Sequence, residues 1–318
     1  MSKYILSLML LSVVVFSACK KEQNGTSADN NAVTAAADKA QINDHQDQVL
    51  TPAGWVAKSK VHHIETGEYL SGEGNRLRRY DRNGKVLADY GAIEQDDARI
   101  PFNPEKSKKP GNGVFPLGSG WITYTYWTNN TASAISYFAT SWTVPPAPAV
   151  NSGQTIFLFN GLQNSSNILQ PVLQWGPSAA GGGSYWAIAN WYVGNNTVYS
   201  NLIRVNPGTN LQGIMSLIGG SGSTRSYTSV FTGYPSINLT VNNIPTLYWA
   251  AESLEAYGVV TCSNYPNTAK TRLSGIDLRV GGAQAPLSWS IDNPVTDCGQ
   301  HSTVVTQGTP NGIVDIYY

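Results

Sequence analysis

From Gly118 to its C-terminus the chain is divided into short runs of β-branched, aromatic and aliphatic residues. Gly, Asn, Pro and Ser separate these runs at near-regular intervals, and no long stripe with the 3.6-residue period of a helix occurs. Such runs are typical of antiparallel strands. The pattern predicts an all-β fold, an antiparallel two-sheet β-sandwich of the concanavalin-like jelly-roll kind. The expected strands cover residues 121–127, 136–144, 155–160, 168–175, 185–193, 197–205, 211–218, 226–232, 236–241, 246–257, 271–280 and 312–318.

Charge is scarce and unevenly distributed. The chain has 20 basic and 20 acidic residues, so its formal charge is zero, which argues against nucleic acid as a partner. No Asp, Glu, Lys or Arg occurs between Pro110 and Ile203. Carboxylate chemistry in the second half of the chain is therefore limited to Glu252, Glu255, Asp277, Asp292, Asp297 and Asp315.

The N-terminus has the pattern of an export signal. Basic Lys3 precedes an apolar run from Tyr4 to Phe16, which is shorter than the ~20 residues that a membrane-spanning helix needs. The Ser17-Ala18-Cys19 ending resembles the lipobox of bacterial lipoproteins. That resemblance implies a signal peptide over residues 1–19, a lipid on Cys19, and an extracytoplasmic location in the cell envelope, at the outer membrane or cell surface. An ordinary signal peptide with a chance cysteine is the alternative.

Two segments precede the sandwich. Residues 20–49 lack aromatic residues and are expected to be a flexible tether. Residues 50–118 form a small charged N-terminal segment with a hairpin predicted around Asn83-Gly84. The basic stretch at residues 106–109 fits either a solvated loop or a processing site, which would make 50–118 a propeptide. The sandwich itself is expected over 119–318, in a monomeric protein.

The two remaining cysteines, Cys262 and Cys298, suit a disulfide in an exported protein. They show no CxxC spacing, and His62-His63 is an adjacent pair whose side chains would point to opposite faces of a strand. We therefore expect neither a metal site nor a cofactor.

Common catalytic signatures are missing. The chain contains no GxSxG motif, no P-loop and no dinucleotide fingerprint. A glycosidase needs two carboxyl groups on one bond, but Glu252 and Glu255 are three residues apart and would face opposite sides of one strand. A glycan-cleaving enzyme would have to recruit a second acid from elsewhere.

Two polar groups stand out in predicted strands. Glu252 shares a strand face with Tyr248 and Ala250, and Gln170 shares one with Gln174. A desolvated Glu can act as a general acid or base, and a rigid Gln amide can donate to an oxyanion. The alternative for Glu252 is an exposed strand end. The tryptophans fit either core packing or a substrate-binding face.

Taken in order, several short motifs resemble the eqolisins, glutamic peptidases of the scytalidoglutamic and aspergilloglutamic type. The resemblance covers residues 119–318. It is carried by Ser141-Trp-Thr-Val-Pro145, Phe157-Leu-Phe-Asn-Gly161, Ile168-Leu-Gln170, Tyr185-Trp-Ala-Ile-Ala-Asn-Trp-Tyr192, Ile203-Arg-Val-Asn-Pro-Gly208 and Trp249-Ala-Ala-Glu252.

The resemblance implies an endopeptidase without metal or cofactor whose partner is a polypeptide substrate. Glu252 would be the general base that activates water, and Gln170 would hold that water and stabilise the oxyanion. This chain has Asn160 where the family has Asp, and Asn190 where it has Glu. The acidic pH optimum and the substrate pocket of the family therefore cannot be carried over to this chain. The residues implied for substrate binding are Tyr185, Trp186, Asn190, Trp191, Asn160 and Gln174.

The competing hypothesis is a non-catalytic carbohydrate-binding module on the same sandwich. Geometry discriminates between the two. The peptidase hypothesis predicts that Gln170 and Glu252 share one concave sheet face and can grip one water molecule between them.

Overall fold

The computed structural model describes residues 46–94 and 119–318, and Asp47–Tyr318 form one compact unit. The predicted signal peptide with Cys19, most of the predicted tether and the basic stretch at residues 106–109 lie outside the described residues. No helix within the described parts has the length and apolar character needed to cross a membrane.

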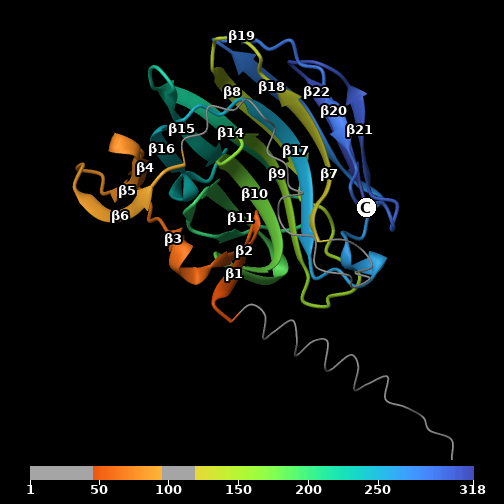
Figure 1. Cartoon of the computed structure of the whole chain (residues 1–318). Coiled ribbons are helices and arrows are strands. Elements are labelled where there is room, and N and C mark those ends of the chain that lie inside the picture. Colours follow the sequence, from red (N-terminus) through yellow and green to blue (C-terminus); the bar gives the residue numbers. More distant parts are fainter. Residues whose placement is uncertain (1–45, 95–118) are drawn as a thin grey trace, which may run out of the picture. The chain divides into compact units, whose positions relative to one another are not determined.

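One layer is a nine-stranded sheet with the order β20-β7-β17-β9-β10-β11-β12-β3, in which β13 also pairs with β11 (Figure 1). All pairs in it are antiparallel except β12 with β3. Its strands are β3 (Val61–His63), β7 (Gly120–Thr128), β9 (Thr155–Gln163), β10 (Ile168–Ser178), β11 (Gly181–Val193), β12 (Thr197–Tyr199), β13 (Ile203–Arg204), β17 (Trp249–Tyr257) and β20 (Ser290–Asp292).

The other layer is an eleven-stranded sheet with the order β21-β22-β18-β8-β14-β15-β16-β4-β5-β6, in which β19 also pairs with β18. Its strands are β4 (Tyr69–Ser71), β5 (Arg76–Tyr80), β6 (Val86–Ala92), β8 (Ile135–Thr143), β14 (Asn210–Gly219), β15 (Thr224–Phe231), β16 (Leu239–Pro245), β18 (Lys270–Val280), β19 (Ala283–Gln284), β21 (His301–Thr306) and β22 (Gly312–Tyr317).

The two sheets pack face to face around one large apolar core. Because side chains alternate across a strand, β9 turns Ile156, Leu158 and Leu162 into this core and the residues between them to the opposite face. The eleven-stranded sheet supplies Phe138 and Met215 from its side. The predicted all-β antiparallel sandwich is confirmed. Each expected run overlaps a strand, although residues 236 and 237 lie in a 3-10 helix and residues 246–248 precede β17.

The charged N-terminal segment is built into both sheets. Strand β3 pairs in parallel with β12, and β4 pairs in parallel with β16, so that β4, β5 and β6 extend the eleven-stranded sheet. The predicted hairpin at Asn83-Gly84 joins β5 to β6, and Gly84 adopts the positive φ that such a turn requires. A separate hairpin, β1 (Gln48–Thr51) with β2 (Gly54–Ala57), lies against β10.

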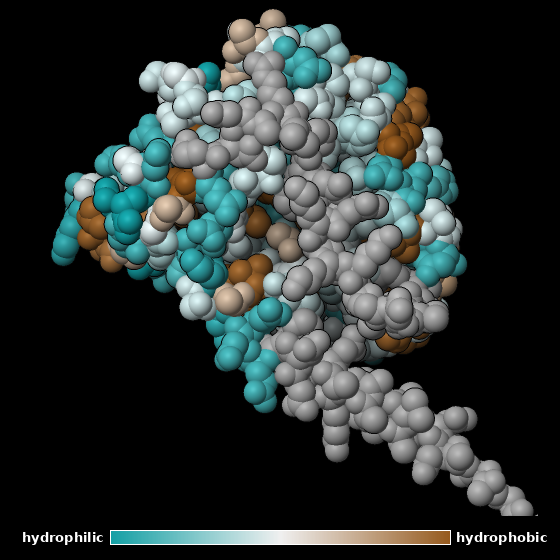
Figure 2. Space-filling view, in the orientation of Figure 1, coloured by the Kyte–Doolittle hydropathy of each residue, from teal (hydrophilic) through white to brown (hydrophobic). Residues whose placement is uncertain are grey.

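The visible surface is mostly hydrophilic to neutral, and apolar side chains appear on it as separate spots (Figure 2). The large apolar residues that are exposed come from distant parts of the chain, for example Trp55, Ile218 and Val305. Isolated exposed apolar residues of this kind are normal in soluble domains and mark no docking face.

Candidate functional site

The face of the nine-stranded sheet that points away from the sandwich core carries a second buried cluster. We call this face the outer face. It includes Phe157 and Phe159 of β9, Val172 of β10, Trp191 of β11 and Ala251 of β17, and Leu50 of the β1–β2 hairpin packs against them. The outer face is therefore covered in part by the N-terminal hairpin.

Gln170 projects from β10 onto the outer face and is fully buried. Its side-chain Nε2 donates to the backbone carbonyl of Pro52, at 3.2 Å, in the turn of the β1–β2 hairpin. Its Oε1 has no hydrogen-bond partner among the described residues. The amide that the sequence singled out thus binds a peptide carbonyl and keeps an acceptor free.

Glu252 projects from β17 in the opposite direction, into the space between the two sheets. It pairs across strands with Asn160 of β9, and it accepts a hydrogen bond from Thr140 Oγ1 of β8, which belongs to the other sheet. Burial raises the pKa of Glu252 well above its usual range, and the Thr140 bond opposes this only in part. The raised pKa favours the neutral form of Glu252. Neither Glu252 Oε2 nor the Oδ1 of Asn160 has a hydrogen-bond partner among the described residues.

The expectation that Gln170 and Glu252 share one face and one water molecule is wrong. Leu169 pairs with Leu162 and Val172 with Phe159, so Gln170 of β10 lies opposite Gly161 of β9. Gly161 in turn pairs with Ala251 of β17. Glu252 is one residue further along β17, so strand alternation places it on the other side of the sheet backbone.

Three residues expected to bind substrate lie inside the sandwich instead. Trp186 packs edge-on against Trp175 in the core, with ring centroids 5.5 Å apart. Asn160 Nδ2 donates to the carbonyl of Gly213. Asn190 donates to the carbonyl of Ile237 and accepts from Ser229, so both polar atoms of its amide are bonded within the fold. These three predictions are wrong because each residue falls on the inward position of its strand.

Three other expected residues lie on strands at outer-face positions. Trp191 packs in the outer cluster and against Tyr199. Tyr185 lies under the guanidinium of Arg204, 4.7 Å from the ring centroid. Gln174 donates to the carbonyls of Gly176 and Gly181 and accepts from Ser178, so both donors of its amide are bound within the fold.

Among the described residues, Glu255 is the buried carboxyl group on the same outer face as Gln170, and the sequence indicated it only as a possible second glycosidase acid. It is fully buried on β17 and accepts a hydrogen bond from the Tyr257 hydroxyl, while its Oε2 has no partner among the described residues. Burial raises the pKa of Glu255 to about 8, against the smaller lowering effect of the Tyr257 bond. Once the register is known, alternate residues of β17 starting from Ala251, which is level with Gln170, lead to Glu255.

The turn of the β1–β2 hairpin reaches both of these groups. Pro52 accepts the bond from Gln170, and a β-carbon built on Gly54 would lie 3.4 Å from the Tyr257 hydroxyl oxygen. The carbonyl of Leu50 accepts from the backbone N–H of Ala179, which holds the hairpin against the end of β10. The turn from Pro52 to Gly54 therefore passes from the Gln170 amide to the pair formed by the Glu255 carboxyl and the Tyr257 hydroxyl.

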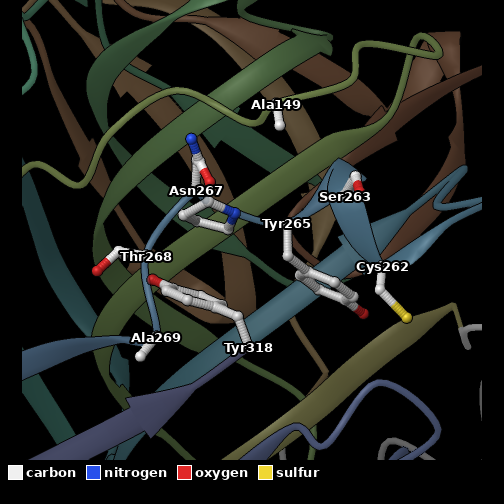
Figure 3. A pocket seen from close by; sticks show the side chains of 9 residues that line it. Ala149, Cys262, Ser263, Tyr265, Asn267, Thr268, Ala269 and Tyr318 are labelled. Carbon is white, nitrogen blue, oxygen red and sulfur yellow. The ribbon is translucent and has the colours of Figure 1, made fainter.

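A cavity of about 410 Å³ lies elsewhere, beside the chain's last residue (Figure 3). Tyr265 and Tyr318 line it, with their rings stacked and centroids 6.2 Å apart. Ser263 and Asn267 are also among its lining residues, but none of them is an acid or a base with a pKa near neutrality. The arrangement offers no acid–base chemistry.

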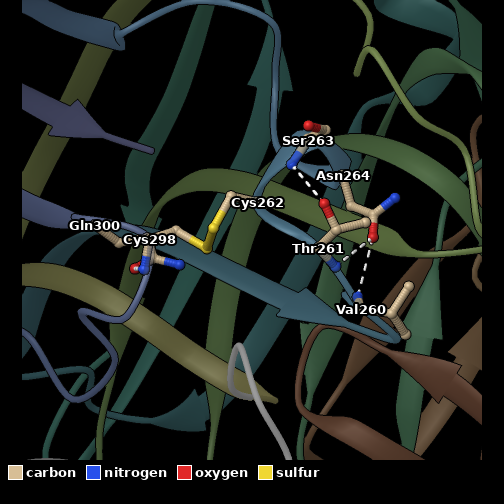
Figure 4. Close-up of a disulfide and its surroundings, with 7 residues drawn as sticks. All are labelled: Val260, Thr261, Cys262, Ser263, Asn264, Cys298 and Gln300. Carbon is tan, nitrogen blue, oxygen red and sulfur yellow. Dashed lines mark hydrogen bonds between the residues drawn. A yellow bond between two sulfur atoms is a disulfide. The ribbon is translucent and has the colours of Figure 1, made fainter.

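The predicted disulfide between Cys262 and Cys298 is confirmed (Figure 4). It connects the turn after β17 to the segment between β20 and β21. On the first side, the Asn264 side chain accepts from the backbone N–H groups of Val260 and Thr261, which fixes the turn. The disulfide thereby ties the end of β17, with Glu255 and Tyr257, to the C-terminal strands.

No protein-family model matches the chain, and no curated protein matches it in sequence. Among solved structures, the chain is similar to scytalido-glutamic peptidase with a peptide-based transition-state analogue, at 15% identity and a TM-score of 0.43. It is similar to the same peptidase with a transition-state analogue inhibitor, at 14% identity and a TM-score of 0.44. It is also similar to SCP-B, a member of the eqolisin family, in complex with the tripeptide Ala-Ile-His, at 13% and 0.40. Each alignment covers 64% of this chain and 99% of the other.

Proposed function

We propose that the protein is a peptidase that binds an extended polypeptide on the outer face and uses Glu255 as its acid–base group. The observation that carries this proposal is the hydrogen bond from Gln170 Nε2 to the Pro52 carbonyl. In it the site already holds a peptide backbone, by the same donor that a substrate would use. The turn from Pro52 to Gly54 occupies the path that we assign to the substrate.

In the proposed reaction Glu255 Oε2 takes a proton from water as the water oxygen forms a bond to the substrate's carbonyl carbon. The C–N bond of the resulting tetrahedral intermediate then breaks, and Glu255 returns the proton to the leaving nitrogen. Tyr257 donates to the other carboxyl oxygen and so fixes the orientation of the carboxyl group. A pKa of about 8 lets Glu255 both accept and donate the proton near neutral pH.

Gln170 has a binding role in this proposal. On the register, Glu255 pairs with Phe157, which in turn pairs with Gln174, so Glu255 is level with Gln174 and two strands away from it. Gln170 is four residues further along β10, and the Cα atoms of Gln170 and Glu255 are about 16 Å apart at standard strand spacings. Gln170 therefore holds a carbonyl several residues from the scissile bond, so truncating it should mainly raise KM.

The test measures the cleavage of a denatured protein substrate by three variants between pH 5 and 9. We expect Glu255→Gln to abolish cleavage, Gln170→Ala to raise KM about tenfold through one lost hydrogen bond, and Glu252→Gln to retain kcat. Circular dichroism melts check that each variant folds. Activity in Glu255→Gln, or its loss only in Glu252→Gln, would overturn the assignment in favour of the dyad expected from the motifs.

The proposal includes export and anchoring of a monomeric enzyme outside the cytoplasm by a lipid on Cys19. It rests on the basic start, apolar run and Ser17-Ala18-Cys19 ending of the chain. Mass spectrometry of the N-terminal peptide from membranes should find a lipidated Cys19, and Cys19→Ser should release the protein into the soluble fraction. An unmodified, soluble wild-type protein would contradict anchoring but would leave the peptidase proposal intact.

A further inference from the structure

Gln163, the last residue of β9, has a side-chain amide with no partner in the fold. It lies on the outer face, and it is fully buried. Neither its Nε2 nor its Oε1 makes a hydrogen bond within the described parts of the chain. By contrast, the amides of Gln174 and Asn190 use both their donor and acceptor atoms. Buried amides are almost always paired, so Gln163 points to a ligand.

The residues around Gln163 share this property. Gln163 pairs across strands with Trp249 on one side and with Ile168 on the other. Gln170 is therefore its diagonal neighbour, about 7–8 Å away. The indole Nε1 of Trp249 and the Oε1 of Gln170 are likewise buried without partners among the described residues. One ligand group at this position could reach all three side chains.

The strand positions between these side chains are occupied by small residues. Gly161 and Ala251 pair with each other in the row next to Gln163 and Trp249, in line with Gln170. A β-carbon on Gly161 would meet only ordinary contacts at 3.6 Å, from Ile168 and Phe159. Gly161 has no side chain of its own, so none projects from this position of β9 between the amides of Gln163 and Gln170.

The donor and acceptor of Gln163 select one kind of partner. A primary carboxamide presents its N–H and C=O on the same side and can pair with both atoms of another amide. A trans peptide group presents them on opposite sides and can satisfy only one. In these two rows, strands β7, β9, β10 and β17 carry no Asp, Glu, Lys, Arg or His. A charged side chain would therefore be buried without a counter-charge.

We propose that Gln163 is a specificity-determining residue that pairs with an asparagine or glutamine side chain of the bound polypeptide. Gln170 and Trp249 supply further hydrogen bonds to the same segment. The inference rests on the proposed function, because it places the polypeptide on the outer face beside Gln170. It adds the class of side chain that the site selects.

The test separates binding from cleavage. Fluorescent decapeptides that differ at one position, with Gln, Glu or Leu scanned along the sequence, are titrated into the full chain carrying Glu255→Gln. We expect the tightest binding when Gln occupies one defined position, about tenfold over Leu or Glu there, since an unpaired buried amide is costly. Gln163→Leu should erase this preference, whereas Gln284→Leu, at an exposed glutamine of β19, should keep it.

Each outcome is decisive. Equal binding of the three peptides at every position, or a preference that survives Gln163→Leu, overturns the proposal. If Gln163→Leu fails to fold, the near-isosteric Gln163→Met provides the same comparison. If wild type binds carboxamide peptides selectively yet cleaves none, the peptidase proposal falls and the subsite stands. If it cleaves peptides without regard to Gln, the subsite falls and the peptidase proposal stands.

Discussion

Gln170 and Glu252 project from opposite faces of the same sheet. Gln170 faces the β1–β2 hairpin and donates to Pro52, whereas Glu252 faces the second sheet and accepts from Thr140. The backbone of the sheet lies between them, so no single water molecule can contact both. The buried carboxyl group on the face of Gln170, within the described residues, is Glu255, and the proposed acid–base chemistry depends on it.

The stability of the protein should fall as pH rises from about 4.5 to 8. The pKa of Glu255 is raised to about 8 and that of Glu252 also lies well above 4.5, in each case chiefly through burial. In this range the folded state keeps a proton on Glu255 that the unfolded chain has released, so Glu255 lowers the unfolding free energy by about 1.4 kcal/mol per pH unit, and Glu252 acts in the same direction. Above pH 8 Glu255 is ionised in the folded state as well, so it no longer contributes to the decline in unfolding free energy.

Urea unfolding at pH 5, 6.5 and 8 measures this effect. Glu252→Gln cannot ionise and keeps the size of the side chain, so the variant should show a shallower decline than wild type and should be the more stable protein at pH 8. The control is Glu65→Gln at an exposed position, which should follow wild type. Parallel pH profiles for Glu252→Gln and wild type would mean that Glu252 is ionised in the fold.

The pH dependence of peptide cleavage should report Glu255. As a general base it acts in its ionised form, so kcat/KM should rise about tenfold per pH unit below a midpoint near 8 and then level off. The Tyr257 hydroxyl stabilises the ionised form of Glu255, so Tyr257→Phe should move the midpoint to higher pH. A midpoint near 4.5, or one indifferent to Tyr257→Phe, would assign the titration to another group.

Loosening the β1–β2 hairpin should raise activity. Leu50 is 7% exposed and packs in the outer cluster, so Leu50→Asp places a charge against apolar side chains and favours release of the turn from Gln170. Substrate would then meet a free site, and KM should fall about tenfold if the turn is bound in most molecules. Val86→Asp, at a 48% exposed position on β6, is the matched control. An unchanged KM in Leu50→Asp would show that the turn does not compete with substrate.

Removal of the disulfide should lower stability without abolishing the fold. Cys262 and Cys298 are 36 residues apart, and closing a loop of that length lowers the entropy of the unfolded chain by an amount worth about 4 kcal/mol. The double variant Cys262→Ala/Cys298→Ala should therefore lose about this much in urea unfolding. Wild type in reducing agent should match it, and a loss below about 1 kcal/mol would show that the disulfide is dispensable.

The sequence by itself determined the layers of this protein. Alternating runs bounded by Gly, Asn and Pro specify strands because side chains of period two bury one face, and this local rule located most strands of both sheets. The short β20 and β21 were missed, since a few polar residues carry no such period. The disulfide was predicted because two cysteines were left in a chain with the pattern of an export signal.

Only the tertiary structure decided which side chains meet. Motif order placed Gln170 and Glu252 on nearby strands, but a shift of one residue in register exchanges the two faces of a strand, and register depends on pairing across the whole sheet. The same pairing sent Trp186, Asn160 and Asn190 into the core. The contact of Pro52 with Gln170 joins residues far apart in the chain, and no local pattern encodes it. Local periodicity specifies strands, whereas the site is set by long-range packing.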